Sequence, residues 1–176
     1  MSETDQRYPI GKYIPPTEFN PAVRELLVKQ IASAPTELRS AVAGLSDEQL
    51  DTPYRPAGWT IRQIVHHLPD SHLNAYVRFK LALTEDEPTI RPYNQARWAE
   101  LPEAMTAGTE VSLALLEAVH RRWVTSIDDL PVELFERRFR HPEIGVMTLN
   151  ELLAMYAWHG RHHTAQIVSL RKRMRW

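Results

Sequence analysis

Three of the chain's eight histidines lie in one short stretch, YAWHGRHHTAQI, at residues 156–167. His159 and His163 are four residues apart, so on a helix both rings leave the same face, one turn apart. Two imidazoles at this spacing can bind one divalent ion together, because zinc–nitrogen bonds of about 2 Å suit their separation. The stretch indicates either a metal site or two histidines whose polar atoms are satisfied by other groups.

The position of these two rings on the expected helix favours the metal site. A helix turns about 100° per residue, which places both rings within the apolar stripe of Leu152, Ile167 and Leu170. A core excludes polar side chains unless their hydrogen bonds or charges are satisfied. A histidine pair at this spacing is often only structural, but its place inside the stripe points to a shared ligand, with a third imidazole from another helix.

A second histidine-rich segment, TIRQIVHHLPDSHLNAYVRF, can supply that third ligand. It contains His66, His67 and His72. On a helical wheel His72 lies inside the apolar stripe of this segment, His67 on its edge and His66 outside it. Pro69 lies between them and disturbs the helical phase, because proline removes a backbone donor and clashes with the preceding turn. The spacing therefore leaves both His67 and His72 open as the third ligand.

Two residues near these histidines are candidates for a catalytic role, Asp70 and Gln166. Asp70 follows His67 by three residues, so it can orient that ring or act as a general base; a solvated helix residue is the alternative. Gln166 lies at the margin of the last helix's stripe. Tyr156 and His162 are further candidates for hydrogen bonds to ligating imidazoles, which usually donate their second N–H to a neighbour.

Other charged and aromatic residues have weaker claims to a function. An anionic substrate could be bound by Arg62, Arg78 or Arg161, although exposed surface charge is the expectation for each. We expect the aromatic residues Trp59, Trp98 and Trp158 to serve in packing rather than in a binding box.

Composition limits the classes of protein to which the chain can belong. Its 176 residues carry a net charge of −1, which argues against a nucleic-acid partner; the basic end, RKRMRW, suits the end of a helix. There is no cysteine, so any metal must be held by His with Asp, Glu or water. No signal pattern or membrane-spanning apolar run is present. We therefore expect a cytoplasmic protein without a membrane partner.

The apolar periodicity predicts four long helices in one domain covering residues 1–176. The first begins at Asn20, with Pro35 kinking or restarting it before Gly44, and the second runs from Thr60 to Leu83. The third covers Met105 to Ile127 and the last Thr148 to Met174. The expected fold is all-α, an antiparallel four-helix bundle with an extended arm at residues 1–19 and a small hairpin or irregular insertion before the last helix.

The chain resembles a known family in the segments GWTIRQIVHHLPDSHLNAYVRFKLAL and YAWHGRHHTAQI. Both are similar to the DinB superfamily, in particular its YfiT-like branch of proposed metal-dependent hydrolases. YPIGKYIPP, RPYNQARWAEL and HPEIGVMTLNELLAMYAWHGRHH extend the resemblance over almost the whole chain. The resemblance implies a four-helix bundle with one divalent metal ion, zinc or nickel, held by three histidines. Matched to this sequence they are His67, His159 and His163, and Pro69 departs from the helix-compatible residue expected after HHL.

The resemblance also implies an enzyme with a small-molecule substrate and a homodimeric assembly. A site of three neutral histidines leaves a coordination position open, as in catalytic zinc sites, so hydrolysis by metal-activated water is the first expectation. Relatives of the branch are similar to bacillithiol S-transferases, in which a low-molecular-weight thiol would be the cosubstrate. A bundle with a purely structural ion and a metal-free binding or damage-response module are the remaining alternatives.

Overall fold

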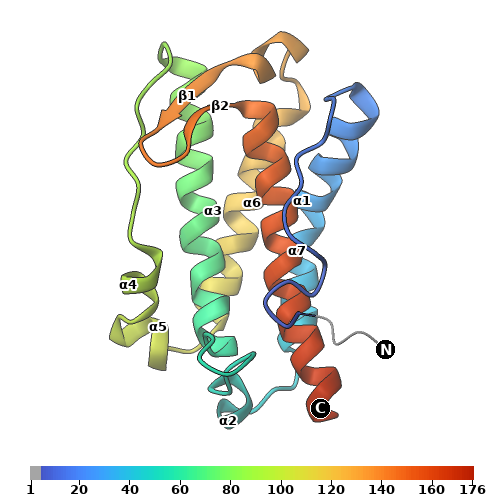
Figure 1. The fold of residues 1–176 in the computed structure, drawn as a ribbon, viewed down its shortest axis with the longest axis vertical. Helices are drawn as coiled ribbons and strands as arrows, with labels where there is room; N and C mark the ends of the chain where they lie inside the picture. Colours follow the sequence, from blue (N-terminus) through green and yellow to red (C-terminus); the bar gives the residue numbers. More distant parts are fainter. Residues whose placement is uncertain (1–4) are drawn as a thin grey trace.

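The computed structural model describes residues 5–176, so the first four residues of the expected arm lie outside the described part. Four long helices form a bundle, α1 (Pro21–Val42), α3 (Ile61–Thr84), α6 (Glu110–Asp128) and α7 (Leu149–Met174), as Figure 1 shows. The predicted four-helix bundle is confirmed. In the described part, no helix is long and apolar enough to cross a membrane.

Consecutive long helices are not always neighbours in this bundle. Helix α1 packs against α6 and α7, and α3 packs against the same two helices. Two helices run in each direction, α1 and α7 in one and α3 and α6 in the other (Figure 1). The segment between α3 and α6 makes this possible, because it returns along the outside of the bundle and carries α4 (Gln95–Ala99) and α5 (Pro102–Thr106).

Side-chain caps explain where the helices begin. Thr60 accepts from the backbone N–H of Gln63, whose side chain accepts from the backbone of Thr60, and Thr148 forms the same capping box with Glu151. Asn20 caps α1 through its side chain, and Pro21 occupies the first turn. These predicted starts are confirmed.

The third long helix begins at Glu110 and not at Met105. Met105 belongs to α5, and the chain is extended at Ala107. The Ala107 carbonyl accepts hydrogen bonds from Arg62 Nη1 at 3.0 Å and from His66 Nε2 at 3.2 Å. These bonds from α3 hold that carbonyl outside a helix, and Gly108 and Thr109 directly before Glu110 are the local signal for the break.

Two prolines lie inside long helices without ending them. Pro35 lies within α1 and Pro69 within α3, and both are buried. Each removes one backbone hydrogen bond, but packing on neighbouring helices outweighs that loss. The expected restart at Pro35 therefore does not occur, and α3 continues from His67 to His72 without interruption.

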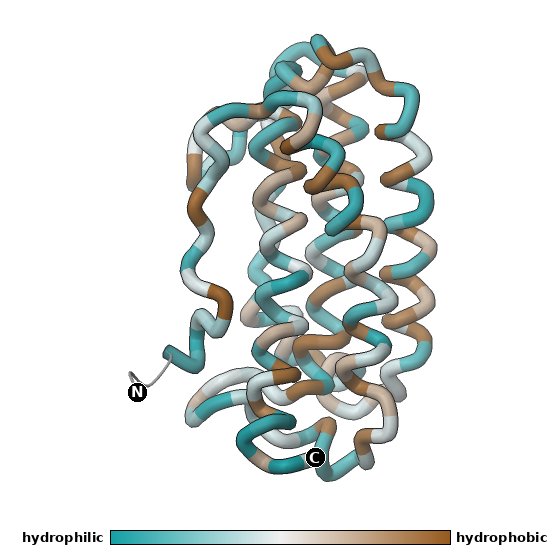
Figure 2. The backbone as a smooth tube through the Cα atoms, turned by 90° about the vertical axis from the view of Figure 1, so that its right-hand side faces the viewer, coloured by the Kyte–Doolittle hydropathy of each residue, from teal (hydrophilic) through white to brown (hydrophobic). Residues whose placement is uncertain are grey.

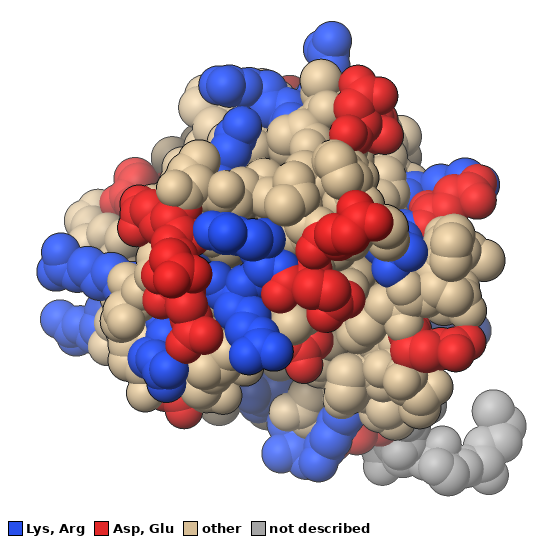
Figure 3. Space-filling view, turned by 90° about the horizontal axis from the view of Figure 1, so that it is seen from above, with Lys and Arg blue, Asp and Glu red and all other residues tan. Residues whose placement is uncertain are grey.

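The predicted insertion before the last helix is a hairpin. A short 3₁₀ helix, η1 (Val132–Glu136), precedes β1 (Arg138–His141), which pairs antiparallel with β2 (Gly145–Thr148). Phe139 faces Met147 across the hairpin, and both are buried against the upper end of the bundle. On the end of the molecule shown in Figure 3, basic and acidic side chains are interspersed.

The core consists of two apolar clusters at different heights along the bundle. The first includes Phe79, Trp123 and Leu153, and the second includes Leu38 and Ile167. Hydrophobic residues recur along all the helices in the view of Figure 2. On α3, α6 and α7, histidines occupy the positions between the two clusters; all of them are buried except His159, which is half-buried. These residues form what we call the histidine layer: His67, His72, His120, His159 and His163.

Candidate metal centre

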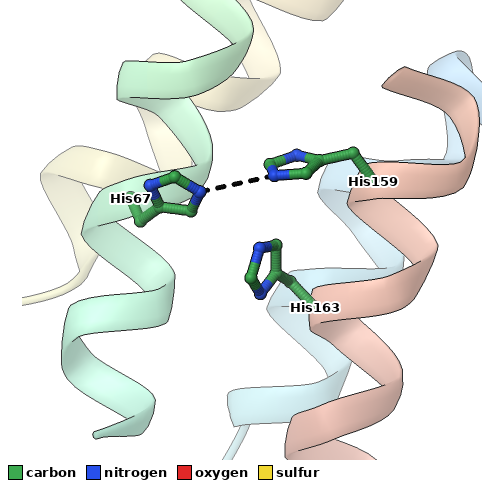
Figure 4. Close-up of side chains that lie close together, drawn as sticks. All are labelled: His67, His159 and His163. Atoms are coloured by element: carbon green, nitrogen blue, oxygen red, sulfur yellow. Dashed lines mark hydrogen bonds between the residues drawn. The ribbon is translucent and has the colours of Figure 1, made fainter. Parts of the chain in front are cut away.

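Three histidines of this layer point their rings at one another from two helices. His67 comes from α3, and His159 and His163 come from successive turns of α7 (Figure 4). Their potential ligand atoms all lie within 4.8 Å of one another. The Nε2 atoms of His67 and His159 are 3.4 Å apart. We call these residues the three-histidine cluster, and the structure brings together all three histidines that the resemblance implied.

Burial keeps the three rings neutral. His67 and His163 expose only 4% and 9% of their surface. Desolvation lowers the pKa of His67 to about 4, and it lowers the pKa of His159 and of His163 well below 6.5, with neighbouring imidazoles adding to the effect. Neutral imidazoles have the free lone pair that a metal ligand requires.

Gln166 selects the tautomer of His163. The Gln166 amide Nε2 lies 3.0 Å from the backbone carbonyl of Arg7, which can only accept a hydrogen bond. The amide oxygen therefore faces His163 Nδ1 at 2.9 Å, and that nitrogen carries the proton. As a result, Nε2 of His163 is left unprotonated. This contact also ties the N-terminal arm to the site.

A row of three imidazoles selects the tautomer of His159 in the same way. His120 Nδ1 lies 2.5 Å from the carbonyl of Ile31. His120 Nε2 lies 2.8 Å from His72 Nδ1, and His72 Nε2 lies 3.2 Å from His159 Nδ1. Because the carbonyl only accepts, each neutral ring of this imidazole row donates at Nδ1 and accepts at Nε2. Nε2 of His159, which faces His67, is therefore unprotonated.

The structure distinguishes the two histidines of α3 that the sequence left open. His67 lies in the three-histidine cluster, whereas His72 is fully buried behind His159 and uses both nitrogens in the imidazole row. His66 also uses both nitrogens, on Ser112 Oγ and on the Ala107 carbonyl. Neither His66 nor His72 has a free lone pair directed at the cluster.

Sequence reasoning missed His120. Burial lowers its pKa to about 4, and it exposes 1% of its surface. A signal was present, because His120 follows Leu116 by four residues and precedes Trp123 by three, which places it on the apolar stripe of α6. A buried histidine on a stripe indicates a hydrogen-bonded polar group wherever it occurs.

The two catalytic candidates differ in their relation to the cluster. Gln166 is buried and contacts His163 directly. Asp70 is half-buried, and burial, with a smaller effect of Glu103, raises the pKa of its carboxyl to about 6. Within the described part of the chain its carboxylate makes no hydrogen bond to the three-histidine cluster. Its catalytic role stays a prediction.

The other candidates also occupy distinct places. Tyr156 packs edge-on against His72, with ring centroids 5.0 Å apart. His162 stacks on Trp158 at 4.4 Å and accepts at Nε2 from Gln166. Trp59 packs against His67 at 4.7 Å between ring centroids, so this tryptophan forms part of the wall of the site.

The predicted arginines separate clearly. Arg62 is buried and forms ion pairs with Asp51 at 2.6 Å and Asp47 at 2.8 Å, so its role is structural. Arg161 is exposed on α7. Arg78 is buried, with 8% of its surface exposed.

Two cavities reach the three-histidine cluster. One, of about 410 Å³, is lined by Trp59, Trp158 and the two cluster histidines of α7. The other, of about 630 Å³, reaches His159 from the side of Arg78 and Tyr156. Volumes of this size suit small-molecule ligands.

The three-histidine cluster fits a divalent metal ion. Two ligands about 2.0–2.1 Å from a tetrahedral ion lie roughly 3.3–3.4 Å apart, and the Nε2 atoms of His67 and His159 have this separation. No fourth His, Cys, Asp or Glu among residues 5–176 joins the group. The donor set is that of a site with an open coordination position.

Comparison with known proteins identifies the family. The family model of the DinB superfamily matches residues 30–167, and the chain belongs to that superfamily. Proteins from Bacillus cereus strain 03BB102 and Bacillus thuringiensis subsp. konkukian strain 97-27 are each 50% identical over 175 residues, covering 98% of this chain and 99% of theirs. Both are named as proposed metal-dependent hydrolases.

A solved structure shows the same fold. YfiT from Bacillus subtilis, described as a proposed metal-dependent hydrolase with an unusual four-helix bundle topology, is 44% identical. It superimposes with a TM-score of 0.95, covering 98% of this chain and 99% of its own. The resemblance to the YfiT-like branch is confirmed.

Proposed function

We propose that the protein is a metal-dependent hydrolase whose divalent ion is held by His67, His159 and His163. The observation that carries the proposal is the convergence of three neutral imidazoles, two of which lie 3.4 Å apart at Nε2. The names of the relatives support the same activity. Zinc and nickel are the proposed ions, because imidazole suits both.

The chain's own residues prepare the site for the ion. Gln166 and the imidazole row each place a proton on Nδ1 of a cluster histidine, so Nε2 is the ligating nitrogen in both. A divalent ion held by three neutral ligands with an open position supplies Lewis acidity and lowers the pKa of water towards 7. Trp59 covers one side of the cluster, and the two cavities admit a small substrate.

Asp70 is the proposed proton carrier. A carboxyl group with a pKa near 6 can exchange a proton close to neutral pH, and burial provides this value. The negative charge of Glu103 adds a smaller rise to the pKa of Asp70. This role requires a substrate that reaches Asp70 from the cavity beside His159.

A low-molecular-weight-thiol S-transferase is the competing proposal. The chain has no cysteine, so a sulfur nucleophile would have to come from a cosubstrate. The cavities of about 410 and 630 Å³ can hold a thiol and a second substrate. We also propose that the protein forms a homodimer, which the family resemblance implies.

The test combines metal content with two assays on the same protein. Wild type and the His67→Ala and His163→Ala variants are loaded with zinc or nickel and assayed on ester and amide substrates, and then on an electrophile with and without a small thiol. We expect about one ion per chain in wild type only, with hydrolysis that needs no thiol. Product formation that depends strictly on the thiol would replace the hydrolase with the S-transferase. Absence of bound metal in wild type would overturn both.

A further inference from the structure

Arg78 is a buried cation without a partner. It exposes 8% of its surface on the inner side of α3. Among residues 5–176, no carboxylate forms an ion pair with it, no group forms a hydrogen bond with its guanidinium, and no aromatic ring lies beneath it. The guanidinium nitrogens have no partner in this described part of the protein but are open to the adjoining cavity, so this arginine presents an unpaired positive charge for which a ligand can supply the negative charge.

Arg62 shows how the same helix treats a structural arginine. It is also buried, yet two aspartates and a backbone carbonyl satisfy three of its nitrogens. Arg78 lies sixteen residues further along α3 and has none of these partners. The difference is not explained by burial, because the two residues expose 4% and 8% of their surfaces.

The guanidinium of Arg78 faces the cavity of about 630 Å³ that reaches His159, here called the Arg78 cavity. Other donors line it. The Tyr93 hydroxyl is buried without a hydrogen-bond partner. Burial raises the pKa of Tyr93, and the nearby Ser71 opposes this rise. No hydrogen bond of normal geometry joins Ser71 to Tyr93. His141 accepts at Nδ1 from the Glu143 backbone, so its proton is on Nε2.

The charge of the Arg78 cavity selects the kind of anion. Among residues 5–176, Arg78 is the only Lys or Arg that lines it, and His141 is neutral because burial and the nearby Arg78 lower its pKa. Glu143, which also lines it, is exposed and makes no ion pair with Arg78. The lining therefore carries one fixed positive charge, neutral donors and one exposed carboxylate, a balance that complements a singly charged planar oxyanion better than a phosphate dianion.

We propose that Arg78 binds a carboxylate of the substrate and thereby places the rest of the molecule against His159. As a statement about the substrate this rests on the proposed function, but the carboxylate site itself does not need the metal. The cavity has the size of a small-molecule site, and its lining includes both the unpaired arginine and a member of the three-histidine cluster.

The test uses benzoate, neutral benzamide and phenyl phosphate, three probes that share a phenyl ring and differ in the attached polar group. Each is titrated into metal-free and metal-loaded protein labelled with ¹⁵N-arginine, and the Nε–H signal of Arg78 is identified by its loss in Arg78→Lys. We expect benzoate to shift that signal in both forms and to bind about tenfold or more tightly than benzamide, the value of a charge-assisted hydrogen bond.

Two variants make the test specific. Arg78→Gln removes the charge and should weaken benzoate by about tenfold or more without changing benzamide. Arg161→Gln is the matched control, since it removes an exposed arginine of α7 that lines neither cavity. We expect the control to bind benzoate like wild type.

Three results would overturn the assignment. They are equal affinity for benzoate and benzamide, benzoate binding that needs the metal and survives Arg78→Gln, and tighter binding of phenyl phosphate than of benzoate. Benzoate binding to Arg78 in a protein that takes up no metal would instead contradict the proposed hydrolase while leaving the carboxylate site in place.

Discussion

The apolar clusters and the histidine layer are built by the same helices but are stabilised in opposite ways. In the clusters, side chains such as Phe79 and Leu38 exclude water and need no specific partner. In the layer, each imidazole needs a defined neighbour, and two backbone carbonyls, of Arg7 and Ile31, determine which nitrogens carry protons. The apolar clusters therefore stabilise the fold, whereas the histidine layer lowers that stability in part because it holds the imidazole lone pairs in fixed positions.

Removing a cluster histidine should have the largest effect on metal binding. His159→Ala deletes one proposed ligand and the end of the imidazole row, so we expect metal affinity to fall by more than about 100-fold, beyond the usual effect of losing an outer-shell partner. Competition with a chelating dye measures this loss. Far-ultraviolet circular dichroism should show the helical content of wild type. An affinity within a few-fold of wild type would remove His159 from the ligand set.

An apolar variant tests the other half of the comparison. Phe79 is fully buried and packs edge-on against Trp123. Phe79→Ala should lower the free energy of unfolding by about 3–5 kcal/mol, because it leaves a cavity in the core. Urea unfolding of the metal-free protein measures this value. Metal stoichiometry should remain at the wild-type level, and its loss would show that the two regions are not separable.

Acid should destabilise the histidine layer before the apolar clusters. In the folded protein the pKa of His67 and of His120 is about 4, below the ordinary 6.5 that holds when the chain is unfolded. The unfolded chain therefore binds protons first, and stability present above pH 6.5 is lost as the pH falls towards 4. We expect metal-free protein to lose at least about 2 kcal/mol between pH 6.5 and 4.5.

Thermal unfolding across this pH range tests the effect. His120→Leu, which removes one of the titrating rings, should show a smaller loss of stability on acidification. An unchanged pH profile in His120→Leu would contradict the lowered pKa of this ring.

A smaller effect on metal binding is expected from the far end of the imidazole row. His120 contacts no ligand atom of the three-histidine cluster, but its Nε2 accepts a hydrogen bond from Nδ1 of His72. His120→Leu should weaken metal binding by no more than about 10-fold, below the roughly 10–100-fold usual for a partner that bonds a ligand directly, because His72 lies between His120 and His159. His120→Gln should recover part of the affinity, because its amide oxygen can also accept from His72. Equal affinity in wild type and both variants would show that the row does not act on the metal site.

Local patterns predicted a large part of the fold. The capping residues Thr60 and Thr148 indicated the starts of α3 and α7, and the stripe around His159 and His163 indicated that both rings are inward. Such features depend on residues within a few positions of one another. The start of α6 was missed although Gly108 and Thr109 precede it, and bonds from Arg62 and His66 to the Ala107 carbonyl, more than forty residues away, support it.

The sequence predicted candidate residues of the site but not which groups each of them contacts. The sequence left His67 and His72 open, since Pro69 made the phase uncertain and their difference lies in what each nitrogen meets. Arg78 could not be separated from Arg62 for the same reason, because a paired and an unpaired arginine have the same local signature. Helix neighbours and carbonyl acceptors are properties of the tertiary fold.

The most direct test of the central claim is X-ray absorption spectroscopy of the metal-loaded protein. Bound zinc should show three imidazole nitrogens at about 2.0–2.1 Å, together with an exchangeable oxygen ligand. The imidazole count should fall to two in His163→Ala at saturating metal. Two imidazoles in wild type, or four protein ligands without an exchangeable oxygen, would contradict a three-histidine site that is open for catalysis.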